Sequence, residues 1–373
     1  MTATGSEFAQ LKIARGTCYA LFVYDIALAI DLEKVDARIA QAKPRRKIRH
    51  GRRSPKHFEY HPQPLRITEE GEPLVIGAYR TQPAVDLILY DFGAVTVLYS
   101  IALEGPLASL LDLSVNLYDN DLLVADSRSR VERILGLIRE MVQRPNIADI
   151  TEDYVVFHIQ FLQQPDQVQA LIGEHAQEIA QILRAEAQAL SADEVQDALG
   201  GRISYSTRDL TIVDWNAALV VDSEGDDVFA VLEFANVELL EMRHLDRSLD
   251  EALGRAYEVL ARSKWSSVFS SDGEDMRRIG QLQVDSALLF EGVNNALKLL
   301  GDQYLARVYR LVSQRFHLAE WDEGILRKLQ TLESIYEKIS DRVSTRRLEL
   351  LEWIIILLIS ISIVLPFLLG SEH

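Results

Sequence analysis

The sequence predicts an α+β or α/β N-terminal domain, followed by a long-helix hairpin or stalk and one C-terminal transmembrane helix. Strand patterns and helix patterns intermingle up to about residue 225, which is typical of a mixed domain. Beyond that point the strand patterns stop and helical periodicity takes over. An uncharged apolar segment follows at 353–369. We therefore expect three parts, at 1–225, 226–347 and 348–370.

The composition indicates a folded chain with a substantial core. Its 373 residues are 48% hydrophobic and 25% charged, which suits two or three domains of about 150 residues each. The net charge of −17 argues against a protein that coats nucleic acid, because such a protein needs a basic surface. The single cysteine, Cys18, excludes an intramolecular disulfide and a cysteine-rich zinc site.

The first elements of the mixed domain read as strands with one short helix. Residues 14–30 combine aromatic and β-branched side chains and predict a strand, with a helix that begins near Asp31. Residues 85–101 predict two apolar strands joined at a turn that contains Gly93. Glycine supplies the positive φ that a tight turn needs, so we expect a central hairpin here.

The remainder of this domain alternates between helix and strand. Residues 127–143 have helical spacing, and Ser127 is a candidate N-cap. Residues 152–162 alternate as a strand, residues 166–190 resume a helical pattern, and residues 209–222 predict a further pair of strands.

A basic run at 43–56 interrupts the domain. It holds eight basic residues and no acidic residue, together with two prolines and a glycine, which predicts an exposed, mobile loop. Such a run binds an anionic membrane surface, or ribosome or RNA, or is an ordinary solvated loop. The candidate contact residues are Arg45, Arg46, Lys47, Arg52 and Arg53.

The helical part is expected to form a hairpin or short coiled-coil stalk. Apolar residues recur at three- and four-residue steps between Leu232 and Leu260, a second helix is expected at 284–316, and a third begins at Ile325. The third helix carries a short heptad seam, which needs a partner helix and favours a homo-oligomer. The seam residues are Leu329, Leu332, Tyr336, Ile339 and Val343.

The apolar segment at 353–369 has the composition of a membrane span. It contains 17 uncharged residues, of which 13 are Leu, Ile, Val or Phe. As a helix it extends about 26 Å, close to the hydrocarbon thickness of about 30 Å. Its large apolar residues contribute about −4 to −8 kcal/mol to insertion. A buried core helix is the alternative, although such a helix normally keeps one polar face.

The flanks of this segment predict a tail anchor. Trp353 is the expected interfacial anchor residue. Arg342, Arg346 and Arg347 precede the span, so the positive-inside rule leaves the body in the cytoplasm. The first residues lack a basic cluster followed by an apolar stretch, so no signal peptide is expected. The residues assigned to the bilayer anchor are Trp353, Leu358, Ile361 and Leu365.

Motifs that carry chemistry are not evident. We found no phosphate-binding, dinucleotide-binding or nucleophile-elbow pattern, so no catalytic residue, cofactor, metal or small-molecule substrate is inferred. Glu241 and His244 are one helical turn apart, as in di-iron bundles, but a single copy favours a surface or stalk-facing pair. An enzyme with a cryptic ligand site remains a rival, with weak candidates at Asp214, Trp215 and Asn216 beside a strand end.

Several segments together resemble the required-for-meiotic-nuclear-division (RMD) family, a domain of unknown function with bacterial, fungal and mitochondrial members. The similar pieces are Thr17-Cys18-Tyr19, Asp31-Leu32-Glu33-Lys34, VDLILYDFGAVTVLYS, ALSADEVQDAL before ISYSTRDLTIVDW, and RRLELLEWIIILLISISIVL.

The resemblance implies an α/β domain, a helical hairpin and one C-terminal membrane helix. It also implies homo-oligomerisation and, for mitochondrial relatives, support of organelle translation from the inner membrane. It supplies no catalytic residues. The chain departs from the family inside the span, where Ser360, Ile361 and Ser362 stand in place of the acidic residue of many relatives.

The leading hypothesis is therefore a non-enzymatic, tail-anchored scaffold that associates with itself and holds a cytosolic partner, such as the translation machinery, at the membrane. The alternatives are an enzyme with a cryptic ligand site and an accessory subunit of a membrane complex.

Overall fold

The computed structural model describes residues 11–41, 49–51, 62–164, 168, 171–262, 280, 284, 303–338, 341, 352 and 355–356. The chain divides into two compact units. The first comprises 1–244 and 289–322, and the second comprises 245–288 and 323–373. A mixed α/β body followed by helices is confirmed.

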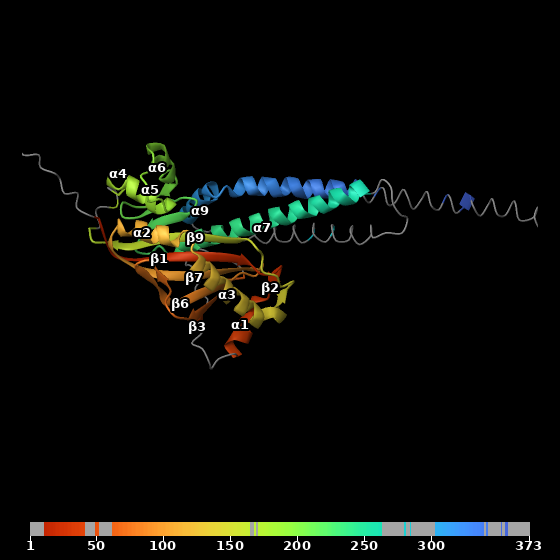
Figure 1. The fold of residues 1–373 in the computed structure, drawn as a ribbon, viewed down its shortest axis with the longest axis horizontal. Helices are drawn as coiled ribbons and strands as arrows, with labels where there is room; N and C mark the ends of the chain where they lie inside the picture. The colour runs from red at the N-terminus through yellow and green to blue at the C-terminus, as the bar shows by residue number, and fades with distance from the viewer. Residues whose placement is uncertain are drawn as a thin grey trace, which may run out of the picture. The chain divides into compact units, whose positions relative to one another are not determined.

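A ten-stranded sheet forms the first unit (Figure 1). Its order is β10-β11-β12-β9-β1-β7-β6-β4-β3, with β5 beside β6, and β2 and β8 form a separate small sheet. The strands are β1 Lys12–Asp25, β2 Ala29–Ile30, β3 Arg49–Gly51, β4 Leu65–Glu70, β5 Val75–Ile76, β6 Tyr79–Leu89, β7 Ala94–Pro106, β8 Val142–Gln143, β9 Thr151–Leu162, β10 Arg202–Ile203, β11 Leu210–Val213 and β12 Ala217–Val221. Only the β9–β12 pair is parallel among the described strands, so the body is of the α+β kind.

Helices cover both faces of this sheet. Those of the body are α1 Leu32–Gln41, α2 Ser109–Leu117, α3 Asp121–Ile138, the 3-10 turn η1 Arg139–Met141, α4 Leu171–Glu174, α5 Ala176–Arg184, α6 Ala192–Ala198, the first half of α7 Asp226–Arg262, and α9 Gln303–Arg315. On one face the Tyr24 hydroxyl is 2.7 Å from the Ser127 hydroxyl of α3. On the other face the Tyr19 ring packs on Phe229 of α7 with centroids 4.5 Å apart. Because both faces are covered, the sequences of the central strands are nearly continuous runs of apolar residues.

The hairpin expected at 85–101 is confirmed as β6 and β7. Its turn is closed by hydrogen bonds from Tyr90 N to Ala94 O and from Gly93 N to Tyr90 O. Gly93 has a φ of +106°, and a Cβ there would lie 1.6 Å from the carbonyl oxygen of Ala27. Glycine is thus required both by the backbone angle and by the close approach of the next segment.

Two helix boundaries differ from the sequence prediction. The N-cap of α3 is Asn120, whose side chain accepts a hydrogen bond from Leu123 N, whereas Ser127 is buried about two turns further along. The long helix expected at 166–190 is interrupted, because Ala185 ends α5 in the left-handed region with a φ of +53°. Helical periodicity marks an apolar face but does not mark where a helix starts or stops.

The first half of α7 belongs to the body rather than to the stalk. The boundary expected at 225 therefore lies inside the first unit, which continues to His244 and takes in α9. The physical reason is burial, since Leu232, Ala235 and Leu240 are fully enclosed.

The second unit contains the rest of α7 and most of a helix at 318–338. Leu249, Ala252 and Leu332 are fully buried. Lys328 Nζ lies 2.7 Å from carboxylate oxygens of both Asp246 and Asp250 on α7. The expected helical hairpin thus has a described pair of helices joined by apolar packing and two ion pairs.

Two segments to which the sequence assigns functions fall largely outside the described residues. Arg45, Arg46, Lys47, Arg52 and Arg53 are among those not described, whereas Arg49–Gly51 pairs with β4 as an edge strand. Trp353, Leu358, Ile361 and Leu365 are likewise not described. Within the part of the chain that the structure describes, no helix is both long and apolar enough for a membrane span.

Candidate functional site

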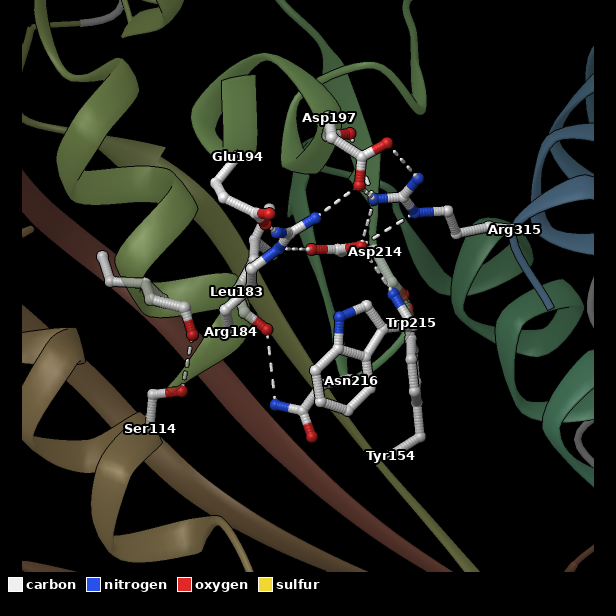
Figure 2. A network of polar contacts seen from close by, with 11 residues as sticks. Ser114, Tyr154, Leu183, Arg184, Glu194, Asp197, Asp214, Trp215, Asn216 and Arg315 are labelled. Atoms are coloured by element: carbon white, nitrogen blue, oxygen red, sulfur yellow. Dashed lines mark hydrogen bonds and ion pairs between the residues drawn. The ribbon is translucent and has the colours of Figure 1, made fainter. Parts of the chain in front are cut away.

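Asp214, one of the three strand-end candidates, is the centre of a buried ion-pair network (Figure 2). The residue follows β11 and is completely buried. Arg184 Nε of α5 donates to its Oδ2 at 2.9 Å, and Arg315 Nε of α9 donates to its Oδ1 at 2.8 Å. Figure 2 shows both guanidinium groups directed at this one carboxylate. Its charge is therefore compensated inside the protein.

Helix α6 joins the same network through Asp197. The Asp197 carboxylate accepts hydrogen bonds from Arg184 Nη2 at 2.5 Å and from Arg315 Nη2 at 2.9 Å. The hydrogen bond from Arg315 lowers the pKa of Asp197. Glu194 pairs with Arg184 at the exposed rim. The network therefore ties α5, α6 and α9 to the β11–β12 turn.

The other two strand-end candidates also make structural contacts. The Asn216 side chain donates to the carbonyl oxygen of Leu183 at 3.3 Å, and the Trp215 amide donates to Asp214 Oδ1 at 2.9 Å. Trp215 is 52% exposed. These contacts position a turn and a helix end, and they assemble no substrate site.

A large open pocket lies elsewhere on the body, on the α7 face of the sheet. Its volume is about 1510 Å³, which exceeds the usual size of a small-molecule site. Strand residues of β1, β4, β6 and β7 form its floor, and the 205–209 loop, the β12–α7 link and the first turns of α7 form its walls.

The pocket wall is acidic and aromatic. Its only described cationic side chains are Arg66 and Arg208, and its rings come from Tyr19, Tyr90 and Phe229 among others. Its carboxylate side chains are Asp86, Asp209, Asp222, Glu224, Asp226, Asp227 and Glu233. Carboxylates thus outnumber guanidinium groups, and the wall favours a cation over an anion.

Local contacts hold several of these side chains in place. Arg66 Nη1 donates to Asp86 Oδ2 at 3.3 Å. The Tyr90 hydroxyl donates to Glu233 Oε1 at 3.1 Å, and burial raises the pKa of Glu233. Asp209 accepts backbone hydrogen bonds from Tyr205 at 2.7 Å and from Ser206, which fixes the loop at the pocket rim.

Sequence reasoning missed this pocket. A local signal was present, since Asp222, Glu224, Asp226 and Asp227 follow one another closely after an apolar strand. In the sequence this acidic run indicates only the boundary between the mixed domain and the helices. The other walls come from segments remote in sequence, such as Tyr19 on β1, so no spacing pattern connects them.

Glu241 and His244 do not form the surface or stalk-facing pair that the sequence favours. Glu241 is 2% exposed and lies in the body. His244 Nε2 lies 3.9 Å from Asp25 Oδ1 at the end of β1. Among the described residues, no group of three or more His, Cys, Asp or Glu side chains is arranged to hold a metal ion.

The predicted stalk seam is partly enclosed by its own chain. Leu332 is fully buried, while Leu329 and Tyr336 are half-buried. Ile339 and Val343 lie outside the described residues. The described part of the seam therefore already has packing partners within one chain.

Comparison with known proteins identifies the family of the body. The family model described as "Uncharacterized protein MJ0711, N-terminal domain" matches residues 15–227, more than half of the chain. The chain belongs to the MJ0711 N-terminal domain family. It is 24% identical over 303 residues to the uncharacterized protein MJ0711 of Methanocaldococcus jannaschii, covering 80% of this chain and 83% of that relative. No solved structure matches the chain significantly.

The segment matched to the MJ0711 N-terminal domain runs from β1 to the first residues of α7. It contains the strand floor of the pocket and the acidic β12–α7 link. It excludes Phe229, Glu233 and Tyr304, which complete the pocket wall. The comparison therefore confirms membership in an uncharacterized domain family and nothing finer.

Proposed function

We propose that this chain is a non-enzymatic, tail-anchored scaffold of RMD type, whose α+β body holds a partner beside a membrane. The observation that carries the proposal is the uncharged segment at 353–369, with 13 large apolar residues out of 17. Such a segment inserts favourably into lipid, whereas the acidic remainder of a chain whose total net charge is −17 stays in water. The structural use of Asp214 and its neighbours further supports a role that needs no catalysis.

The proposal assigns roles to the remaining sequence features. The basic run at 43–56 supplies the contact with an anionic surface, either lipid headgroups or RNA of the translation machinery. Self-association uses the exposed flank of the helix at 318–338 together with the seam residues beyond it. An accessory subunit of a membrane complex would differ by being degraded when its partner is absent.

Changing Leu358 and Ile361 to arginine is expected to release the chain from membranes. Each arginine near the middle of a span costs about 2.5–3.5 kcal/mol, so two remove most of the insertion free energy. The measurement is the distribution of the chain between the membrane pellet and the soluble fraction after high-speed centrifugation. The matched control is Leu358→Ala with Ile361→Val, which stays in the pellet. Retention of the arginine variant in the pellet would count against the anchor.

A second candidate function, the binding of a small organic cation, is favoured by the pocket. Seven carboxylates and several aromatic faces line it, and both attract a cation. Asp226 and Asp227 occupy the first turn of α7, where they complement the helix dipole and disfavour an anionic ligand. This role belongs to the α+β body and is compatible with the scaffold.

Spermidine is a suitable probe for the pocket. We expect spermidine to raise the melting temperature of the full chain. We expect the double variant Asp226→Asn with Asp227→Asn to show a smaller rise, corresponding to an apparent affinity for spermidine that is at least about tenfold weaker. The matched control is Asp121→Asn with Asp193→Asn, which removes two acids from the first turns of α3 and α6. An equal rise in both variants would reveal general charge screening rather than a site.

A further inference from the structure

The part of α7 that belongs to the body carries three buried carboxyl groups. Glu233, Glu238 and Glu241 are 5%, 2% and 2% exposed. Glu233 accepts a hydrogen bond from Tyr90 at 3.1 Å, and Glu238 accepts one from the Tyr309 hydroxyl at 2.8 Å. Glu241 differs from both, because its two carboxylate oxygens are buried and have no hydrogen-bond partner among the described residues. A buried carboxylate without a partner is costly in its charged form.

A second buried carboxyl group faces Glu241. Asp25, the last residue of β1, is 6% exposed, and its negative charge adds to burial in raising the pKa of Glu241. Burial raises the pKa of Asp25 itself to about 7. The two groups therefore resist ionising together.

Several titratable and charged groups of neighbouring elements lie near this pair, and one of them, His244, forms an ion pair with Asp25 when its ring is protonated. On α7, His244 Nε2 is 3.9 Å from Asp25 Oδ1. On β9, Glu152 is engaged by Arg243 of α7, and burial still raises the pKa of Glu152 to about 7. On β7, the buried hydroxyl of Thr96 contributes no charge and no described hydrogen bond. The guanidinium group of Arg243 is thus committed to a third carboxylate.

Glu241 lies at a position on α7 where a change in its charge can affect the packing of the helix on the body. The first compact unit ends at His244, and α7 continues to Arg262 in the second unit. Glu241 is therefore in the last turn of α7 that belongs to the body. A change in charge at this turn therefore acts on the last turn of α7 within the first unit.

We propose that Asp25 and Glu241 form a proton-dependent latch, which holds the 236–244 stretch of α7 on the sheet while at least one carboxyl is protonated. When both ionise, repulsion and desolvation favour a loosened helix in which water reaches Glu241. The sign follows from the raised pKa values of both acids. Acids of this kind stabilise the packed state at low pH and lose that contribution as the pH rises through their pKa in the folded protein. The latch does not depend on the membrane anchor.

Hydrogen exchange of the full chain at pH 6 and pH 8.5, corrected for intrinsic exchange rates, tests the latch. We expect protection of 236–244 to fall at least about tenfold at the higher pH, since one pKa unit corresponds to tenfold. Protection of β7 serves as the internal reference. Glu241→Gln is expected to keep protection high at both pH values.

Two further variants make the outcome decisive. Asp25→Asn should likewise abolish the loss of protection of 236–244 at the higher pH. This variant provides the test if Glu241→Gln does not fold. Glu251→Gln, at a solvent-exposed position of the same helix, should leave the fall intact. The proposal is overturned if the protection of 236–244 in the wild type falls no more than that of β7 between pH 6 and pH 8.5. It is also overturned if that protection falls in either latch variant as much as in the wild type.

Discussion

A chain that carries Arg184→Met and Arg315→Met is expected to lose about 3–5 kcal/mol of unfolding free energy. These two arginines are the cationic partners of Asp214, whose side chain has no exposed surface. Without them a carboxylate stays buried and uncompensated, which is far costlier than the absence of an exposed ion pair. Urea unfolding of the full chain in detergent measures the change.

The pH dependence of this loss identifies its cause. An unpaired buried carboxyl has a raised pKa, so it takes up a proton as the pH falls and its cost diminishes. The difference between variant and wild type should therefore shrink between pH 8 and pH 5. The control is Glu194→Gln, at a side chain that is 56% exposed, and we expect it to cost no more than about 1 kcal/mol. A double variant within 1 kcal/mol of the wild type would falsify the structural role of the network.

Gly93→Val is expected to destabilise the body by about 3 kcal/mol or more, or to prevent its folding. The backbone at this turn has a φ of +106°, which L-residues avoid, and the new Cβ would lie 1.6 Å from the carbonyl oxygen of Ala27. The positive φ alone costs about 1–2 kcal/mol and the overlap adds a similar or larger amount. Thermal unfolding followed by circular dichroism provides the measurement.

The control for this prediction is a glycine in an unconstrained position. Gly136 lies inside α3 and has no heavy atom within 4 Å of an added Cβ. Gly136→Ala is expected to stabilise the chain by about 0.5–1 kcal/mol, because alanine restricts the unfolded state and favours helix. If Gly93→Val were as mild as Gly136→Ala, the packing of the turn against Ala27 would be wrong.

The sequence predicted those parts of the fold that depend on local pattern. The strand at 152–162 and the turn at Gly93 carry their own signals, namely alternation and a glycine between apolar runs. The N-cap of α3 was placed at Ser127 instead of Asn120, because both residue types are good caps. Only the structure shows that Ser127 is buried against Tyr24.

The candidate sites were not predictable to the same degree. Asp214 looked like a strand-end polar residue, and its partner Arg315 is brought to it by a helix from a distant part of the chain. The pKa of Glu241 is raised by burial and by the charge of Asp25, which is remote from it in the sequence. The single Glu-x-x-His copy favours a surface or stalk-facing pair, because the spacing of Glu241 and His244 gives no indication of which strand will face them.

Carbonate extraction of membranes that contain the unmodified chain tests the central claim most directly. The claim is that lipid surrounds the apolar segment near the C-terminus while the acidic body remains in water. The account predicts that the chain stays in the membrane pellet at alkaline pH, where peripheral proteins are released. Recovery of the intact, folded chain in the supernatant would contradict it.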